Sequence, residues 1–432
     1  MPRRSPERKR APLPAGFGTI WSTVAIDLVG FGIILPVLPL YAERYGASPA
    51  TIGVLLASFS IAQLLLAPVW GAVSDRAGRK PVLVLSLAGT AVGSLVTGLA
   101  GSLPLLFAGR LLDGASGASV SVAQASAADL AEPGQRARLF GLLGAAFGVG
   151  FVAGPALGSL AALVDPRLPF FVAAALAGIN AVIATRRLPE TNPRHISSPA
   201  DRPMAVADGI GAEGMGGLDP GAAVDPDTGV DPPAQGAARA PADEAPIGGP
   251  GASGQRRVGL ARLVVVGFGS LVAFSAFEAT FALFGERRLG FGLASTGAVF
   301  TGIGLVLALV EGGLVHPAVR RLGEIRALRL ALAMNAVGLV LLAAVHSWWV
   351  LVPALTALVV GQGLATPSLT AATASVASEG RRGGVLGLQQ SAGGLARVVG
   401  PLLGGLAFQH IGVPAPYLAG AAVMVACALV LG

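Results

Sequence analysis

The sequence predicts an all-α membrane protein with twelve transmembrane helices in two pseudo-symmetric six-helix bundles. The chain is very apolar, its apolar residues form bilayer-length segments, and its second half repeats motifs of the first. Of the 432 residues, 53% are hydrophobic and 12% are charged, whereas an ordinary soluble domain carries about 25% charged residues. The mean hydropathy is +0.71. This composition excludes a soluble globular protein and indicates a chain that crosses a membrane repeatedly.

Twelve apolar segments each approach the roughly 20 residues that a helix needs to cross a bilayer. They lie near residues 17–40, 52–74, 81–100, 104–128, 139–162, 168–185, 260–283, 294–316, 327–346, 349–374, 384–407 and 412–431. The predicted domains are a basic cytoplasmic tail at 1–16, a first bundle at 17–185, a linker at 186–257 and a second bundle at 258–432. The linker is rich in Gly, Pro, Ala and Asp, a composition typical of disorder. A regulatory or docking role for it is the alternative.

A short motif appears once in each half of the chain. The run Gly154-Pro155-Ala156-Leu157-Gly158 recurs as Gly400-Pro401-Leu402-Leu403-Gly404, 246 residues later. The turn containing Gly78 has a partner at Gly323 at nearly the same offset. Duplicated membrane bundles place a substrate site near the bilayer midplane between the halves. The repeat therefore predicts a central site between the two bundles.

The net charge of +7 reflects membrane topology in this reading. Of the 30 Lys and Arg residues, 24 fall in loops on one side of the predicted membrane, and the four on the other side are Arg44, Arg167, Arg287 and Arg288. The positive-inside rule then places both termini and the linker in the cytoplasm. The basic residues thus predict no nucleic-acid partner. The single cysteine, Cys427, allows no disulfide within the chain, and no metal site is predicted.

The loop between the second and third segments, residues 71–80, compresses a charged turn between two apolar helices. Two glycines allow these helices to approach and turn, and the charged residues can pair across the boundary between the halves in one conformation only. The predicted cytoplasmic gate consists of Gly71, Asp75, Arg76, Gly78, Arg79 and Lys80. The alternative is a basic loop that only sets the topology.

Six ionisable residues fall inside the predicted helices: Asp27, Arg110, Asp113, Glu278, Glu311 and Arg397. A charge within the bilayer costs about 2.5–3.5 kcal/mol on insertion scales, so each should face the bundle interior or a water-filled cavity. Four acids against two bases leave a surplus of negative charge, which suits proton coupling or cation binding. Two alternatives stay open: Arg110 and Asp113 neutralise each other, and Glu278 and Glu311 are simply hydrated near helix ends.

The fifth segment carries a motif of Gly150, Gly154, Pro155 and Gly158. It lacks the preceding strand of a dinucleotide-binding fingerprint and lies inside an apolar segment of bilayer length, so that interpretation fails. Glycine and proline within a membrane helix instead allow bending and close helix contact.

These motifs resemble those of the major facilitator superfamily of secondary transporters. The loop 71–80 reads G-x-x-x-D-R-x-G-R-K, and residues 19–190 are similar to the twelve-helix drug/proton antiporters, especially the tetracycline exporters. The resemblance rests on Ser22–Asp27 leading to Leu35–Pro39, on Ser74–Pro81, on Arg110 and on Phe147–Pro155. It implies the major facilitator fold, Asp27 in the binding cavity, Asp75 and Arg79 at the gate, Arg110 in proton coupling, and a fifth-helix motif typical of exporters. Where tetracycline exporters carry acids in helices 3 and 9, this chain has Gly93 and Asn335.

The expected function is secondary active transport: proton-coupled efflux of small amphipathic drugs or metabolites by alternating access across a plasma (inner) membrane. The expected partners are a small-molecule substrate, protons and the lipid bilayer; the chain is expected to be a monomer. It should need no cofactor beyond the proton gradient, and no enzyme activity is predicted because no nucleotide-binding loop or catalytic cluster is present. Uptake or exchange of a sugar, nucleoside or organic acid is one alternative. A transporter-like membrane sensor is another.

Overall fold

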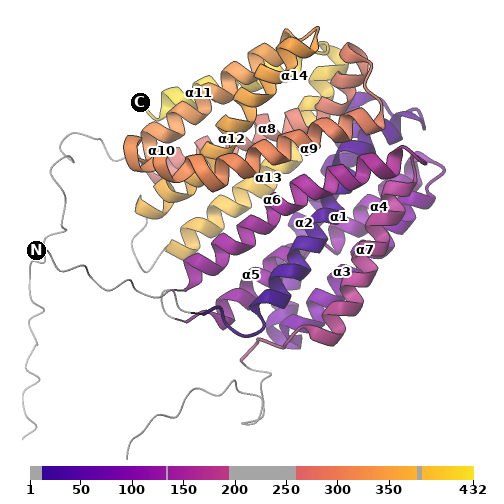
Figure 1. Ribbon diagram of the computed structural model, residues 1–432, viewed down its shortest axis with the longest axis vertical. Coiled ribbons are helices and arrows are strands. Elements are labelled where there is room, and N and C mark those ends of the chain that lie inside the picture. The colour runs from indigo at the N-terminus through magenta and orange to yellow at the C-terminus, as the bar shows by residue number, and fades with distance from the viewer. Residues whose placement is uncertain (1–11, 133–134, 194–258, 377–381) are drawn as a thin grey trace, which may run out of the picture. The chain divides into compact units, whose positions relative to one another are not determined.

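The computed structural model describes residues 12–132, 135–193, 259–376 and 382–432, and these described parts are helical without a strand. The helices of the first half are α1 (Phe17–Glu43), α2 (Pro49–Ala77), α3 (Arg79–Leu99), α4 (Leu103–Ala115), α5 (Ser119–Leu130), α6 (Arg136–Ala162) and α7 (Leu168–Arg187). Those of the second half are α8 (Leu260–Leu289), α9 (Leu293–Leu309), the π-helix η1 (Val310–Leu314), α10 (Val315–Leu322), α11 (Glu324–Ala343), α12 (Trp348–Val376), α13 (Arg382–His410) and α14 (Ala415–Val430). Figure 1 shows both sets.

The predicted twelve passes are confirmed. Ten spans among the described residues are long and apolar enough to cross a membrane, the pass α9–η1–α10 counting as one of them. The shorter apolar helix α14 adds an eleventh. The fourth predicted pass differs from the prediction because it consists of two short helices, α4 and α5, separated by residues 116–118.

The two halves repeat one packing scheme, which confirms the predicted pseudo-symmetry. In the first half α1 packs on α6 and α3 packs on α7; in the second, α8 packs on α13 and α11 packs on α14. The repeated motif lies at one of these contacts in each half. A Cβ at Gly154 would lie 2.6 Å from Gly32 Cα on α1, and one at Gly400 would lie 2.7 Å from the Val272 carbonyl oxygen on α8. Only glycine permits such backbone approach.

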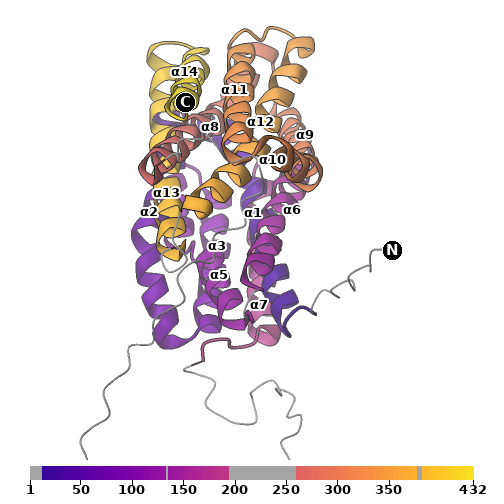
Figure 2. The ribbon, with the colours of Figure 1, turned by 90° about the vertical axis from the view of Figure 1, so that its left-hand side faces the viewer.

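Two helix pairs form most of the seam between the halves: α2 with α13, and α6 with α9. Figure 2 shows α2 beside α13 and α6 near α9. Glycines again set the distance. A Cβ at Gly53 on α2 would lie 2.3 Å from the Pro401 carbonyl oxygen, and one at Gly304 on α9 would lie 2.2 Å from the Phe151 carbonyl oxygen. An ion pair between Glu43 and Arg287, at 3.5 Å, joins the last residue of α1 to the C-terminal end of α8.

We call this end, which bears residues 44–48 and 290–292, the contact end. The opposite end, which bears the turns at Gly78 and Gly323, is the turn end. Gly71 lies eighteen residues, or five helical turns, from Gly53 and therefore on the same face of α2. Gly387 likewise lies eighteen residues from Gly405 and therefore on the same face of α13. A Cβ at Gly71 or Gly387 would have no neighbour within 4 Å. In the described residues the seam is tight at the contact end and loose toward the turn end.

The predicted linker starts later than residue 186. Helix α7 continues to Arg187, and the side chain of Leu188 is buried. Residues 190–192 bind the turn between α2 and α3, as described below. The remainder of the predicted linker, and most of the predicted basic tail, lie outside the described residues.

Candidate functional site

A cavity of about 430 Å³ lies between the two halves. All seven helices of the first half, α1 to α7, line it, and α8 and α13 line it from the second half. Five of the six predicted intramembrane ionisable residues lie on its wall: Asp27, Arg110, Asp113, Glu278 and Arg397. Glu311 does not; its side chain is exposed on η1. The cavity therefore holds three carboxylates and two guanidinium groups.

Asp27 lies on α1 and faces the start of α5. Its Oδ2 accepts a hydrogen bond from Ser119 Oγ at 2.5 Å. Ser119 is the first residue of α5, so the carboxylate also lies near the positive end of that helix, which favours a negative group. Sequence analysis placed Asp27 in the cavity but missed Ser119.

Arg110 and Asp113 form a buried ion pair on α4. Arg110 Nη1 lies 2.7 Å from Asp113 Oδ2, and the side chains are only 4% and 7% exposed. The guanidinium also stacks over the ring of Phe59, 4.4 Å from its centroid, a cation–π contact. Arg110 Nε has no hydrogen-bond partner among the described residues. The pair is mutually neutralising, as one alternative predicted, yet it keeps one donor free inside the cavity wall.

Close packing explains the glycine at position 93. A Cβ there would lie 2.8 Å from both the backbone nitrogen and the Cβ of Asp113. Helix α4 therefore occupies the space that a longer side chain on α3 would need. Asn335 on α11 is the second position at which this chain lacks an acid that tetracycline exporters carry. It is fully buried, and its side-chain amide has no hydrogen-bond partner among the described residues.

The break between α4 and α5 frees backbone carbonyls that side chains from other helices satisfy. Trp70 Nε1 donates to the Ala115 carbonyl at 2.6 Å, and Gln63 Nε2 donates to the Gly117 carbonyl at 3.0 Å. Ser86 Oγ donates to the Ser116 carbonyl. Irregular backbone is tolerated at membrane depth only when it is satisfied in this way. The cluster of Gly114, Ser116 and Gly117 was the available sequence signal.

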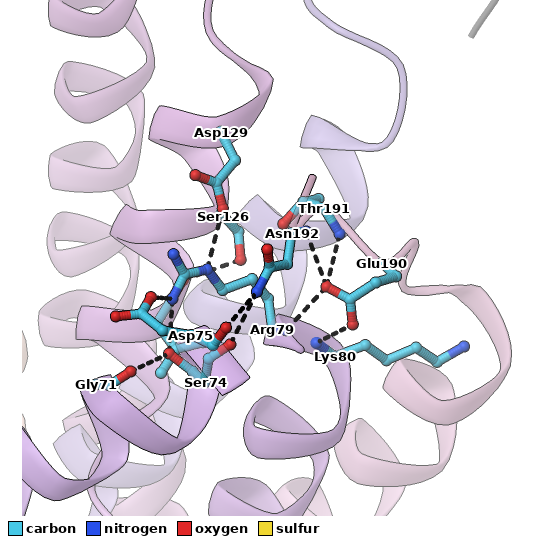
Figure 3. Close-up of polar contacts among 11 residues, drawn as sticks. Gly71, Ser74, Asp75, Arg79, Lys80, Ser126, Asp129, Glu190, Thr191 and Asn192 are labelled. Atoms are coloured by element: carbon cyan, nitrogen blue, oxygen red, sulfur yellow. Dashed lines mark hydrogen bonds and ion pairs between the residues drawn. The ribbon is translucent and has the colours of Figure 1, made fainter. Parts of the chain in front are cut away.

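Arg79 centres the polar network at the turn between α2 and α3 (Figure 3). It contacts Asp75 at 2.6 Å and the Ser74 hydroxyl at 2.7 Å, both on α2, and Asp129 on α5 at 3.0 Å. The predicted gate residues Asp75 and Arg79 are thus brought together. All these contacts lie within the first half, so the predicted pairing across the seam stays a prediction.

Glu190 and Asn192 hold the same turn from the far end of α7. The Glu190 carboxylate accepts backbone N–H bonds from Arg79 at 2.9 Å and Lys80 at 3.1 Å, as Figure 3 shows. It also accepts those of Thr191 and Asn192. Burial works to raise the pKa of Glu190, but these four N–H groups outweigh it and hold the pKa below its ordinary value. Sequence analysis missed both residues because it assigned them to the linker.

Gly78 makes this arrangement sterically feasible. Its φ is +99°, a conformation that favours glycine, and a Cβ there would lie 2.4 Å from Glu190 Oε2. The Asn192 side-chain amide donates to the carbonyl of Asp75 at 3.0 Å. Residues 190–192 therefore fix the geometry of the predicted gate.

The motif glycines of α6 pack against α1. Gly150 lies against Leu28, Gly154 against Gly32, and Gly158 against Ile33. Pro155 lies on another side of α6, and its carbonyl oxygen would be 3.1 Å from a Cβ at Gly297 on α9. The motif thus connects α6 to its own half through glycine and to the other half through proline.

The fold and the cavity define a multi-pass membrane protein of two helical bundles that can enclose a small molecule between them. The family model described as Major Facilitator Superfamily matches residues 20–322 and 314–432. The chain belongs to this superfamily, and it is a membrane transporter rather than an enzyme.

Several characterised proteins are similar along most of their length. The chain is 31% identical to the class C tetracycline resistance protein of Escherichia coli over 391 residues, 89% of this chain and 87% of that protein. It is 28% identical to multidrug resistance protein 1 of Bacillus subtilis strain 168, over 89% of this chain and 87% of that protein. The crystal structure of the human organic anion transporter MFSD10 matches with a TM-score of 0.66 and 26% identity, covering 99% of this chain and 100% of that one.

Proposed function

We propose that the chain is a proton-coupled exporter of small amphipathic compounds that works by alternating access in a plasma (inner) membrane. The observation that carries the proposal is the composition of the central cavity. It combines the carboxylate of Asp27 with the Arg110–Asp113 pair and with the aromatic rings of Phe31, Phe59 and others. Such a mixture of apolar surface and a few polar groups suits an amphipathic ligand.

The similarity to tetracycline and multidrug resistance proteins supports export as the direction. The tight seam at the contact end and the loose seam at the turn end support a state that receives its substrate from the turn end. The positive-inside distribution of Lys and Arg assigns that end, and both termini, to the cytoplasm. We propose that the monomer is the functional unit.

In this mechanism Asp27 exchanges a proton for substrate. Substrate enters the cavity from the cytoplasm, displaces the proton from Asp27, and the halves rock so that the contact end opens. Ser119 holds the Asp27 carboxylate in position through its hydrogen bond. A proton from the outside then binds Asp27 and releases the substrate. This proton is carried to the cytoplasm when the halves rock back. Arg110 and Asp113 stay paired on the cavity wall during this exchange.

The test is substrate-induced proton movement in everted membrane vesicles. Respiration acidifies the vesicle interior, and tetracyclines, macrolides, fluoroquinolones and lipophilic cations are added in turn. An exported compound should dissipate the pH gradient, and Asp27→Asn should abolish the response. Asp165→Asn, at an exposed loop residue that binds the Arg167 backbone, is the matched control and should respond like the parent. Silence across the panel, with insertion and gradient verified, would contradict drug export.

A second candidate is transport of an organic anion, one form of the organic-acid alternative. Arg397 lines the cavity with an exposed side chain. The human relative whose structure matches is an organic anion transporter. Competition by anionic rather than cationic compounds, lost in Arg397→Gln, would favour this candidate.

A further inference from the structure

The seam between α6 and α9 has a regular register that can be extended beyond its last contact. The two helices run antiparallel: Gly297 meets Ser159, and Gly304 meets Phe151. Each step of seven residues along α9 is thus matched by about eight residues back along α6. The next step of seven brings Glu311 to the same face as Gly297 and Gly304 and places it opposite residues 143–144. Of these two, Gly144 lies seven residues from Phe151 and therefore on the same face of α6.

In this structure that part of the seam is not in contact. Glu311 is exposed. On α6, a Cβ at Gly141, Gly144 or Gly148 would find no neighbour within 4 Å. Gly141 lies eighteen residues, or five turns, from Ser159 and therefore on the same face of α6. Near the contact end, this face packs against α9. Both surfaces of the seam therefore continue toward the turn end without touching.

Glu311 lies where the helix geometry is unusual. It is the second residue of the π-helix η1, and two glycines, Gly312 and Gly313, follow it. Short π-helical turns occur frequently at functional sites. The carboxylate is also remote from the central cavity, whose wall does not include it. The site of Glu311 is therefore distinct from that of Asp27.

Few charged groups face Glu311 from the elements around it. Helix α12, which packs on η1, has no ionisable residue. Helix α9 has none either, and α10 carries His316, Arg320 and Arg321 further along its axis. Across the seam, the described charged side chain of α6 is Arg138, six residues from Gly144 and so about 9 Å away along the helix.

Closing the seam between α6 and α9 at the turn end would bury Glu311 against glycines, which have no side-chain donor. Burial of an unpaired carboxylate is strongly unfavourable, and such a group takes up a proton instead. We propose that Glu311 is a second proton-carrying residue of the transporter, which must be protonated for the α6–α9 seam to close at the turn end. The proton comes from water at the open seam and returns to it when the seam reopens. This proposal rests on the alternating-access part of the proposed function.

The test measures the distance between α6 and α10 and needs no substrate. Spin labels are attached at Phe140→Cys and Leu322→Cys, both exposed apolar positions, with Cys427 replaced by Ser. Pulsed electron paramagnetic resonance then gives the ratio of short to long distances between pH 5.5 and 8.5. If one proton is linked to closure, this ratio rises by up to about tenfold for each unit of pH decrease.

Three variants make the result decisive. Glu311→Gln should give mainly short distances at every pH, and Glu311→Asp should restore the pH dependence. Glu324→Gln, which alters a carboxylate at the start of α11 that binds Ser375, should behave like the parent. An unchanged pH dependence in Glu311→Gln, or no pH dependence in the parent, would overturn the proposal. Because these distances are recorded without substrate, a failure of the drug-export hypothesis would be seen separately in the vesicle assay.

Discussion

The two halves share one helix framework but differ in how they hold polar groups. In the first half Asp27 is bonded to Ser119, Arg110 is paired with Asp113, and the Gly78 turn is bound by Glu190. In the second half Glu278 and Arg397 line the cavity, and Arg397 is exposed to it. The Gly323 turn has the same positive-φ backbone as Gly78, at φ +78°, but open space beside it. Duplication has kept the packing, whereas the rigid polar network belongs to the first half.

The largest expected difference between the halves concerns their cavity arginines. Arg110→Leu would leave the buried Asp113 carboxylate without its partner, which typically costs about 3–5 kcal/mol. Arg397→Leu should cost about 0–1 kcal/mol, as for an exposed charge. Thermal unfolding in detergent, followed by tryptophan fluorescence, measures both. Equal losses of stability in the two variants would remove the distinction between the halves.

The paired turns give the next comparison. Gly78→Ala and Gly323→Ala both force alanine into a backbone of positive φ and extended ψ that only glycine adopts readily, at about 1–3 kcal/mol each. Gly78→Ala should cost about 1–3 kcal/mol more, because its Cβ would displace the Glu190 carboxylate from backbone N–H groups that are then left unsatisfied. The same unfolding measurement applies. A variant at Gly323 that is as unstable as the one at Gly78 would contradict the role given to Glu190.

Glu190 should also make the first-half turn sensitive to acid. Its folded-state pKa is lowered from 4.5, so its stabilising contribution is complete above that value and is lost as the pH falls through the lowered value. The parent should therefore be more stable than Glu190→Gln at pH 7, by about 1–2 kcal/mol, and the gap should narrow below pH 4.5. A gap that stays constant down to pH 3 would show that the charge of Glu190 is irrelevant.

The smallest expected effect concerns the serine hydroxyls of the cavity. Ser119→Ala removes the hydrogen bond to Asp27, worth about 1 kcal/mol, and should slow substrate-induced proton movement by about fivefold. Ser391→Ala, which changes an exposed hydroxyl on the cavity wall of the second half, should leave the rate unchanged. Everted vesicles with matched expression allow the comparison. A larger loss in Ser391→Ala would shift the coupling site toward the second half.

Hydropathy and repetition were sufficient to predict the architecture. The apolar segments are long enough to fix twelve passes, and the Gly-Pro repeat marks equivalent contacts in both halves. The break in the fourth pass was missed because residues 116–118 are a short interruption within a segment that is apolar on average over its full length. Its stability depends on Trp70, Ser86 and Gln63 from other helices, which no local pattern could reveal.

The site was predicted less completely. Ionisable residues in apolar segments are conspicuous, so the five cavity residues could be found from the sequence. The polar residues around them could not be found. Nothing local in the sequence indicates that Ser119 binds Asp27 or that Gln63 binds the Gly117 carbonyl. Glu311 is the opposite case. Its residue type predicted a place in the cavity, and only the packing of α6 against α9 shows that it lies along the seam instead. Glu190 was missed because the predicted linker began at residue 186, four residues before it.

Proton exchange at Asp27 is tested most directly with purified protein in proteoliposomes. An inside-acid pH gradient is imposed, and accumulation of a labelled substrate is measured beside substrate counterflow, which requires no net proton movement. The account predicts accumulation that collapses with the gradient and is abolished in Asp27→Asn, while counterflow by that variant persists. Accumulation that survives in Asp27→Asn, or that ignores the pH gradient, would contradict it.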